Sequence, residues 1–248
     1  MNIQQILEKE EAFIHSLPLS WAEKVKLSLT LYRALTWDSQ AYTVLHGSTS
    51  ITKRGNPILF GDGVNCLGKT TTALIVACSS GQFVIDEFSL YNQITKSVYG
   101  NSESCISFRN DAIKYLKDIG IKIPKSIDIN KDSGVHIKPS LLGLSVVSFV
   151  RLKAIVSPHP FDKSFMVEET NPVAKMRKLA VLSNAHRLKW VESSLDRVDG
   201  KSDKKCIIEL DDYTPGYKIP DGLFALPYYD AYLKEPKDII KLLNKEGL

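Results

Sequence analysis

The feature that most constrains this chain is the segment GVNCLGKT at residues 63–70, which matches the phosphate-binding pattern G-x-x-x-x-G-K-[ST] at every fixed position. Its glycines allow successive backbone N–H groups to turn toward an anion, and a following helix adds the positive end of its dipole. In such a loop the lysine contacts the β- and γ-phosphates and the last hydroxyl binds Mg²⁺. The pattern therefore predicts phosphate contacts from Gly63, Val64, Asn65, Cys66, Leu67, Gly68, Lys69, Thr70 and Thr71.

The sequence on both sides of this loop predicts a strand–loop–helix–strand unit. The apolar run 57–60 precedes the loop and predicts a buried strand. Residues 70–80 contain no Gly or Pro and are followed by Gly81, so we expect a helix that ends there. Residues 82–85 predict a second strand, which leads into the acidic pair Asp86-Glu87. Because the strands of a βαβ unit run parallel, we expect these carboxylates to lie beside the phosphate loop.

The bulk properties narrow the class of protein. Of the 248 residues, 44% are hydrophobic and 24% are charged, and no apolar run approaches the roughly 18 residues of a membrane span. The acidic N-terminus lacks the pattern of a signal peptide, and the four cysteines lack metal-site spacing, which favours free thiols in the cytoplasm. The net charge of +4 is unclustered and predicts no nucleic-acid surface, although it suits anionic ligands.

Patterns elsewhere predict the surroundings of the loop. Residues 1–40 predict a helical segment packed on the core, with Ser20 and Glu23 as a capping box. Residues 41–50 alternate enough to predict a strand, and the chain then turns back toward the strand at 57–60.

The second half of the chain is less regular. Residues 141–156 predict two strands or one bulged strand, and residues 172–184 predict a helix. Residues 204–210 predict a further strand. Residues 121–140 and 157–169 lack periodicity and predict long surface connections, either mobile lids or plain loops.

A resemblance to a known family rests on three segments. They are LHG at residues 45–47, the GDG…GKTT loop at 61–71, and FVIDE at 83–87, with Asp86 only 17 positions after Lys69. This compact arrangement resembles the catalytic domain of HPr kinase/phosphorylase and the wider group that shares the phosphoenolpyruvate carboxykinase-like nucleotide fold. The resemblance implies an α/β fold over residues 41–248, with a mixed, P-loop-containing sheet and flanking helices.

The resemblance also implies an activity. We expect an ATP- and Mg²⁺-dependent kinase that transfers the γ-phosphate to a serine-like hydroxyl of a peptide, a protein or a small molecule. The glycine-rich strand with which the family docks HPr is not evident, so we expect a stand-alone kinase with another acceptor. The competing hypothesis is a nucleotide-binding regulatory module without transferase activity. The preferred donor (ATP, GTP, ADP or pyrophosphate) and the oligomeric state, a homo-oligomer included, stay open.

Within that activity, the candidate residues receive roles. Lys69 and the loop amides would hold the phosphates, while Thr70 and Glu87 would hold Mg²⁺. Asp86 would accept the proton of the attacking hydroxyl, and His46 would orient the transferred group or serve only the structure. Alternation along a strand sends only one carboxylate toward the loop, so the sequence does not decide whether Asp86 or Glu87 is the base.

Overall fold

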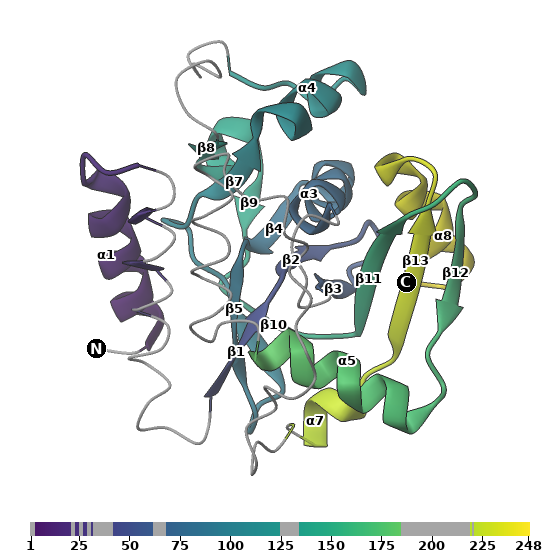
Figure 1. The fold of residues 1–248 in the computed structure, drawn as a ribbon. Helices are drawn as coiled ribbons and strands as arrows, with labels where there is room; N and C mark the ends of the chain where they lie inside the picture. The colour runs from purple at the N-terminus through teal and green to yellow at the C-terminus, as the bar shows by residue number, and fades with distance from the viewer. Residues whose placement is uncertain are drawn as a thin grey trace, which may run out of the picture.

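The structure is a computed structural model that describes residues 3–20, 23–24, 27–28, 31, 42–61, 68–124, 134–184, 219 and 221–248. Within these residues the chain forms sheets of seven, four and two strands with helices around them (Figure 1). The predicted α/β class is confirmed. The predictions for the loop residues 63–67 and the strand 204–210 lie outside the described residues. None of the described helices is long and apolar enough to cross a membrane.

The seven-stranded sheet carries the predicted nucleotide-binding unit. Its order is β12-β13-β11-β3-β2-β4-β9. The bounds of these strands are Ser48–Ile51 (β2), Pro57–Phe60 (β3), Gln82–Ile85 (β4), Ser145–Val146 (β9), Ala154–Pro160 (β11), Phe165–Glu168 (β12) and Tyr228–Leu233 (β13). β2 is antiparallel to both β3 and β4. The strands on either side of the phosphate loop therefore run in the same direction, as predicted, but β2 lies between them.

Helices cover the two faces of this sheet because successive strand residues point to opposite sides. Ile58 and Phe60 of β3 pack with α3 (Lys69–Ser80) and α8 (Ile239–Lys245), whereas Leu59 packs with α5 (Pro172–Asn184). The helix predicted after the phosphate loop is confirmed as α3, which begins after Gly68 and ends at Gly81. Both glycines have a left-handed backbone, with φ of 78° and 79°.

A second sheet continues the first where the chain crosses between them. It contains β1 (Tyr42–His46), β5 (Phe88–Asn92), β6 (Ser97–Tyr99) and β10 (Phe149–Arg151). The single strand predicted at 41–50 is thus divided at Gly47 into β1 and β2, which belong to different sheets. Glycine is required there because a Cβ would lie 2.6 Å from the carbonyl oxygen of Phe60.

The remaining elements lie beside the amino-terminal end of α3 and at the periphery. β7 (Ile106–Arg109) pairs with β8 (Gly134–Ile137), followed by a 3-10 turn at Pro139–Leu142, and α4 spans Asn110–Asp118. α1 (Ile3–Ser16) lies at one side of the fold in Figure 1, and its His15 ring is 5.2 Å from that of His136 in β8. α7 (Asp221–Phe224) and the turn Pro236–Asp238 complete the described elements. The predicted capping box is confirmed, since the carboxylate of Glu23 accepts a hydrogen bond of 2.9 Å from the backbone N–H of Ser20.

Three predictions of irregular structure are wrong in part. Residues 134–137, expected in a long loop, form β8. Residues 157–169, also expected as a loop, contain the end of β11 and all of β12. The segment 141–156, predicted as two strands or one bulged strand, instead contributes to three strands in two sheets. The prolines at 158 and 160 fit into β11 because they lie beyond the end of β3, where the strand is paired only with β13.

Candidate functional site

The first turn of α3 lies against the end of β4, and a carboxylate joins them. The hydroxyl of Thr70 donates a hydrogen bond of 2.9 Å to Oδ1 of Asp86, and the hydroxyl of Ser48 donates to the same oxygen. The backbone N–H of Ser107 donates to Oδ2 at 2.9 Å. Asp86 is only 4% exposed. The threonine of the phosphate-loop motif is therefore connected directly to one of the two predicted acidic residues.

The two adjacent carboxyl groups are costly to ionise in this position. Burial raises the pKa of Asp86 to about 7, helped by the nearby charge of Glu87 and opposed by its three hydrogen bonds. Burial also raises the pKa of Glu87, against the attraction of Lys69 and Arg109. A bound cation would favour the ionised form of both groups. The electrostatics of the pair thus suit a metal ion or another positive charge.

Glu87 has an unusual backbone. The strand β4 ends at Ile85, and Glu87 adopts φ of 63° as the chain passes into β5. This left-handed conformation costs roughly 1–2 kcal/mol for a residue other than glycine. Such strain persists where the surrounding structure imposes it, and it occurs often at functional sites. The expected alternation of the two carboxylates along one strand is absent because neither residue belongs to a strand.

The predicted histidine lies next to this residue. His46 is the last residue of β1, and its Nε2 atom is 3.7 Å from a carboxylate oxygen of Glu87. The His46 side chain is buried, with its ring 6.2 Å from that of Phe88. The structure therefore brings His46 and Thr70, from other parts of the sequence, to the adjacent residues Asp86 and Glu87.

The basic residue of the motif is also close. Lys69 is the first residue of α3, is buried, and lowers the pKa of Glu87 by charge attraction, although burial keeps that pKa raised. Thr71, on the same helix turn, is buried. A Cβ on Gly61, where β3 leaves the sheet, would lie 2.8 Å from the carbonyl oxygen of His46. The described residues on either side of the loop, Gly61 before it and Lys69 after it, therefore both lie close to His46 and Glu87.

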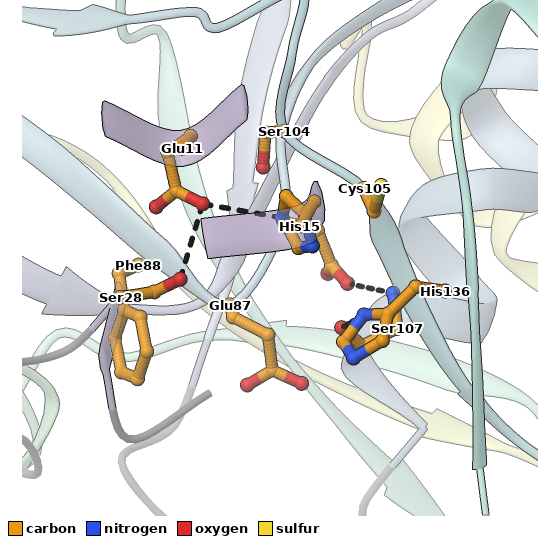
Figure 2. Close-up of a pocket in the computed structure, with 10 residues that line it drawn as sticks. Glu11, His15, Ser28, Glu87, Phe88, Ser104, Cys105, Ser107 and His136 are labelled. Atoms are coloured by element: carbon orange, nitrogen blue, oxygen red, sulfur yellow. Dashed lines mark hydrogen bonds and ion pairs between the residues drawn. The ribbon is translucent and has the colours of Figure 1, made fainter. Parts of the chain in front are cut away.

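A small pocket opens beside the acidic pair (Figure 2). Its enclosed space of about 20 Å³ has room for one water molecule or a single small group. Figure 2 shows Glu87 between Phe88 on one side and Ser107 and His136 on the other. The lining residues are Glu11, His15, Ser28, Asp86, Glu87, Phe88, Ser104, Cys105, Ser107 and His136.

The wall of the pocket opposite the acidic pair comes from the N-terminal helical segment. Glu11 accepts a hydrogen bond of 3.1 Å from Ser28 and lies 3.2 Å from Nε2 of His15. Burial lowers the pKa of His15, but contacts with Cys105 and Glu11 outweigh it and raise the pKa to about 9. His15 is therefore protonated at neutral pH. Sequence patterns did not single out these residues, because no local signal marks the contact between His15 of α1 and His136 of β8, whose ring centroids are 5.2 Å apart.

The donor set around Asp86 fits Mg²⁺ better than a softer metal. Mg²⁺ is bound through one or two carboxylates together with phosphate and water oxygens. Thr70 and Asp86 supply a hydroxyl and a carboxylate oxygen in direct contact, and Glu87 is the next residue along the chain. Among the described residues, no cluster of three or more His, Cys, Asp or Glu side chains forms a site that would hold a metal without such added ligands.

Comparison with known proteins adds no family assignment. No family model matches the chain, and no curated protein matches it.

Proposed function

We propose that this protein is an ATP- and Mg²⁺-dependent kinase of the HPr kinase-like type, which transfers the γ-phosphate to a hydroxyl group of a peptide, a protein or a small molecule. The observation that carries this proposal is the hydrogen bond between Thr70, in a phosphate-loop motif, and Asp86, at the end of a nearby strand. Phosphate-loop proteins hold Mg²⁺ with this combination of a loop hydroxyl and a strand-end aspartate.

The contacts favour a different division of roles between the two acids from the one assigned on the sequence. Asp86, which accepts the hydrogen bond from Thr70, is placed to hold the metal with it. Glu87 then remains for the acceptor, since it lies beside His46 and lines the pocket. We therefore propose Glu87 as the group that takes the proton of the attacking hydroxyl, with His46 orienting it.

In this mechanism the chain acts mainly through position and charge. Lys69 would neutralise charge on the β- and γ-phosphates, and bound Mg²⁺ would supply further charge neutralisation. The pocket beside Glu87 would admit the hydroxyl and little water. Proton transfer to Glu87 would make the acceptor oxygen a nucleophile. That oxygen would form a bond to the γ-phosphorus as the bond to the bridging oxygen of ADP breaks, with ADP as the leaving group.

The enzyme hypothesis accounts for more of the site than the regulatory one. A module that only binds nucleotide needs the phosphate loop, the lysine and the metal contacts. It has no need for a second carboxyl group, half-buried and held in a strained backbone conformation 3.7 Å from a buried histidine. Glu87 and His46 are therefore the residues that favour a transferase.

The test uses a matched pair of variants at Thr70 and one variant at Glu87. Thr70→Val removes the hydroxyl at constant shape and should abolish the Mg²⁺ dependence of ATP binding, measured by calorimetry, whereas Thr70→Ser should keep it. Equal, Mg²⁺-dependent affinity in Thr70→Val would contradict the metal assignment. Glu87→Gln should retain ATP binding and lose about 10²–10⁴-fold in ATP consumption with hydroxyl acceptors. Intact ATP binding in the wild-type protein, without consumption with any peptide, amino acid or sugar acceptor, would favour the regulatory module.

A further inference from the structure

A row of aromatic rings crosses three neighbouring strands on the other side of β3 from Asp86. His159 of β11, Tyr232 of β13 and Phe165 of β12 occupy directly paired positions. The ring centroids of His159 and Tyr232 are 5.2 Å apart, and those of Tyr232 and Phe165 are 4.7 Å apart with an interplanar angle of 18°. Phe161 packs edge-on against Phe165 and Tyr232. These four side chains are called the ring row below.

The ring row lies near the carboxyl ends of the parallel strands, and the phosphate loop begins at the carboxyl end of one of them, β3. Phe60 of β3 pairs with Val156 of β11, and the N–H of Gly61 makes the last bond from β3 to β11. His159 lies three residues farther along β11, or about 10 Å at the rise of a strand. Strands β3, β11 and β13 are parallel, so their carboxyl ends meet at one edge, which is where open α/β sheets bind ligands.

The position of Asp86 and Glu87 indicates how a bound nucleotide would lie across the sheet. Ser48 and Asp86 lie on and after β2 and β4, on one side of β3. Strands β11, β13 and β12 succeed one another on the other side, as Figure 1 shows. With the γ-phosphate near Asp86, a nucleotide that extends across the carboxyl ends of the strands has its nucleoside over β11 and β13. Tyr232 is two strands away from β3, about 10 Å at the spacing of a sheet.

The ring row is both exposed and fixed in place. Phe161 is 49% exposed and Phe165 is 39% exposed. Below them, Asp230 contacts Nε2 of His159 at 3.1 Å and accepts a hydrogen bond of 2.5 Å from Lys178 of α5. Burial opposes ionisation of Asp230, but these bonds outweigh it and hold its pKa below the usual range. An exposed aromatic face supported by a buried aspartate that is bonded to a histidine and a lysine is preorganised to stack against another flat ring.

We propose that the ring row is the binding site for the base of the nucleoside triphosphate that the phosphate loop holds. The inference rests on the proposed function, and it deepens it by naming the side chains that bind the base of the nucleotide donor, which an inorganic polyphosphate lacks. Stacking on aromatic side chains tolerates any base, so the site selects for a nucleoside more than for adenine. Phe165 and Phe161 supply the accessible stacking surface.

The experiment measures the dissociation constants of Mg·ATP and Mg·tripolyphosphate by calorimetry, because tripolyphosphate has the phosphate chain but no base. Phe165→Ala should weaken ATP binding about tenfold, in the range for loss of one base–aromatic stack, and should leave tripolyphosphate affinity unchanged. Phe161→Ala, at the more exposed position, should act in the same direction, and Phe165→Trp should retain affinity. Phe149→Ala is the matched control. Phe149 is 48% exposed and also packs edge-on against a tyrosine, Tyr99, but in the other sheet.

The outcomes separate this inference from the proposed function. Wild-type protein that binds neither ligand overturns the proposed function, and the inference with it. Wild-type protein that binds both ligands equally tightly, or Phe165→Ala and Phe161→Ala variants with unchanged ATP affinity, overturns the ring row as base site and leaves the phosphate site standing. If the two variants change only self-association or peptide binding, the ring row is an interface instead, which also overturns the inference.

Discussion

Replacing Asp86 by Asn should remove Mg²⁺-dependent ATP binding without destabilising the ligand-free protein at pH 8. Burial and the charge of Glu87 raise the pKa of Asp86 from 3.8 to about 7. A shift of about three units at roughly 1.4 kcal/mol each means that keeping this carboxylate ionised in the fold costs up to about 4 kcal/mol. An amide at the same position carries no such cost.

The hydrogen bonds of the site need not be lost in this variant. The amide oxygen can accept from the backbone N–H of Ser107, which cannot reorient. The amide nitrogen can donate to the hydroxyls of Ser48 and Thr70, which can rotate to accept. The proposed metal site is lost instead, because an amide nitrogen replaces the carboxylate oxygen beside Thr70 and the negative charge is gone. We therefore expect Asp86→Asn to lose Mg²⁺-dependent ATP binding while its free energy of unfolding at pH 8 is not reduced.

Denaturant unfolding at several pH values tests this reasoning. The folded pKa of Asp86 lies above its unfolded value, so the folded wild-type protein binds more protons and loses stability as pH rises from about 4 to 7, at up to about 1.4 kcal/mol per pH unit. Asp86→Asn should lack this slope. Asp230→Asn is the control, since Asp230 is also buried at 8% exposed but has a lowered pKa. Its ionised form stabilises the fold above the unfolded pKa, so this variant should lose about 1–3 kcal/mol at pH 8.

The reasoning fails if Asp86→Asn loses more than about 1 kcal/mol at pH 8 and keeps the wild-type pH slope. Asp86 would then be a structural acceptor of hydrogen bonds.

Two further predictions concern neighbouring residues. Glu87→Gly should stabilise the protein by about 0.5–1 kcal/mol, since φ is 63° there, and should abolish phosphoryl transfer. Lys96→Gly, at φ of 57°, should stabilise the protein by a similar amount and leave activity intact. Unfolding titrations measure the stability of both variants, and a turnover assay measures their activity. His15 should titrate with a pKa of about 9 in an NMR experiment, so the stability it contributes is complete below pH 6.5 and fades as pH rises through 9. Glu11→Gln should lower the pKa of His15, because it removes the negative charge beside the ring. A wild-type pKa near 6.5 would contradict the predicted effect of the contacts of His15 with Cys105 and Glu11.

The strand–loop–helix–strand unit was predictable because its signals are local. The apolar run before the loop, the uninterrupted helix-forming stretch and the glycine after it each act within a few residues. The structure confirms β3, α3 and β4 at nearly the expected bounds. The helix at Pro172–Asn184 and the capping box at Ser20 were predictable for the same reason.

The sequence predicted several residues of the site but not the contacts between them. The sequence indicated Thr70, Asp86, Glu87 and His46, but their mutual contacts depend on how two sheets join. Ser48 and Ser107, which donate to Asp86, carry no signal of their own, because a serine in a strand is equally compatible with solvent. The prolines of β11 predicted a loop, since the end of β3 that makes them acceptable is a property of the sheet and not of the segment.

The join between the sheets explains where the side chains of Asp86 and Glu87 lie. His46 pairs with Phe88 in one sheet, and Thr49 pairs with Ile85 in the other. Between these pairs, Asp86 and Glu87 cannot continue either ladder, and the N–H of Gly47 donates instead to the carbonyl of Glu87 at 3.0 Å. Both carboxylates are thereby released from the up-and-down alternation of a strand. One reaches the amino end of α3 and the other reaches the histidine at the end of β1, so the crossing of the chain between the sheets is what builds the site.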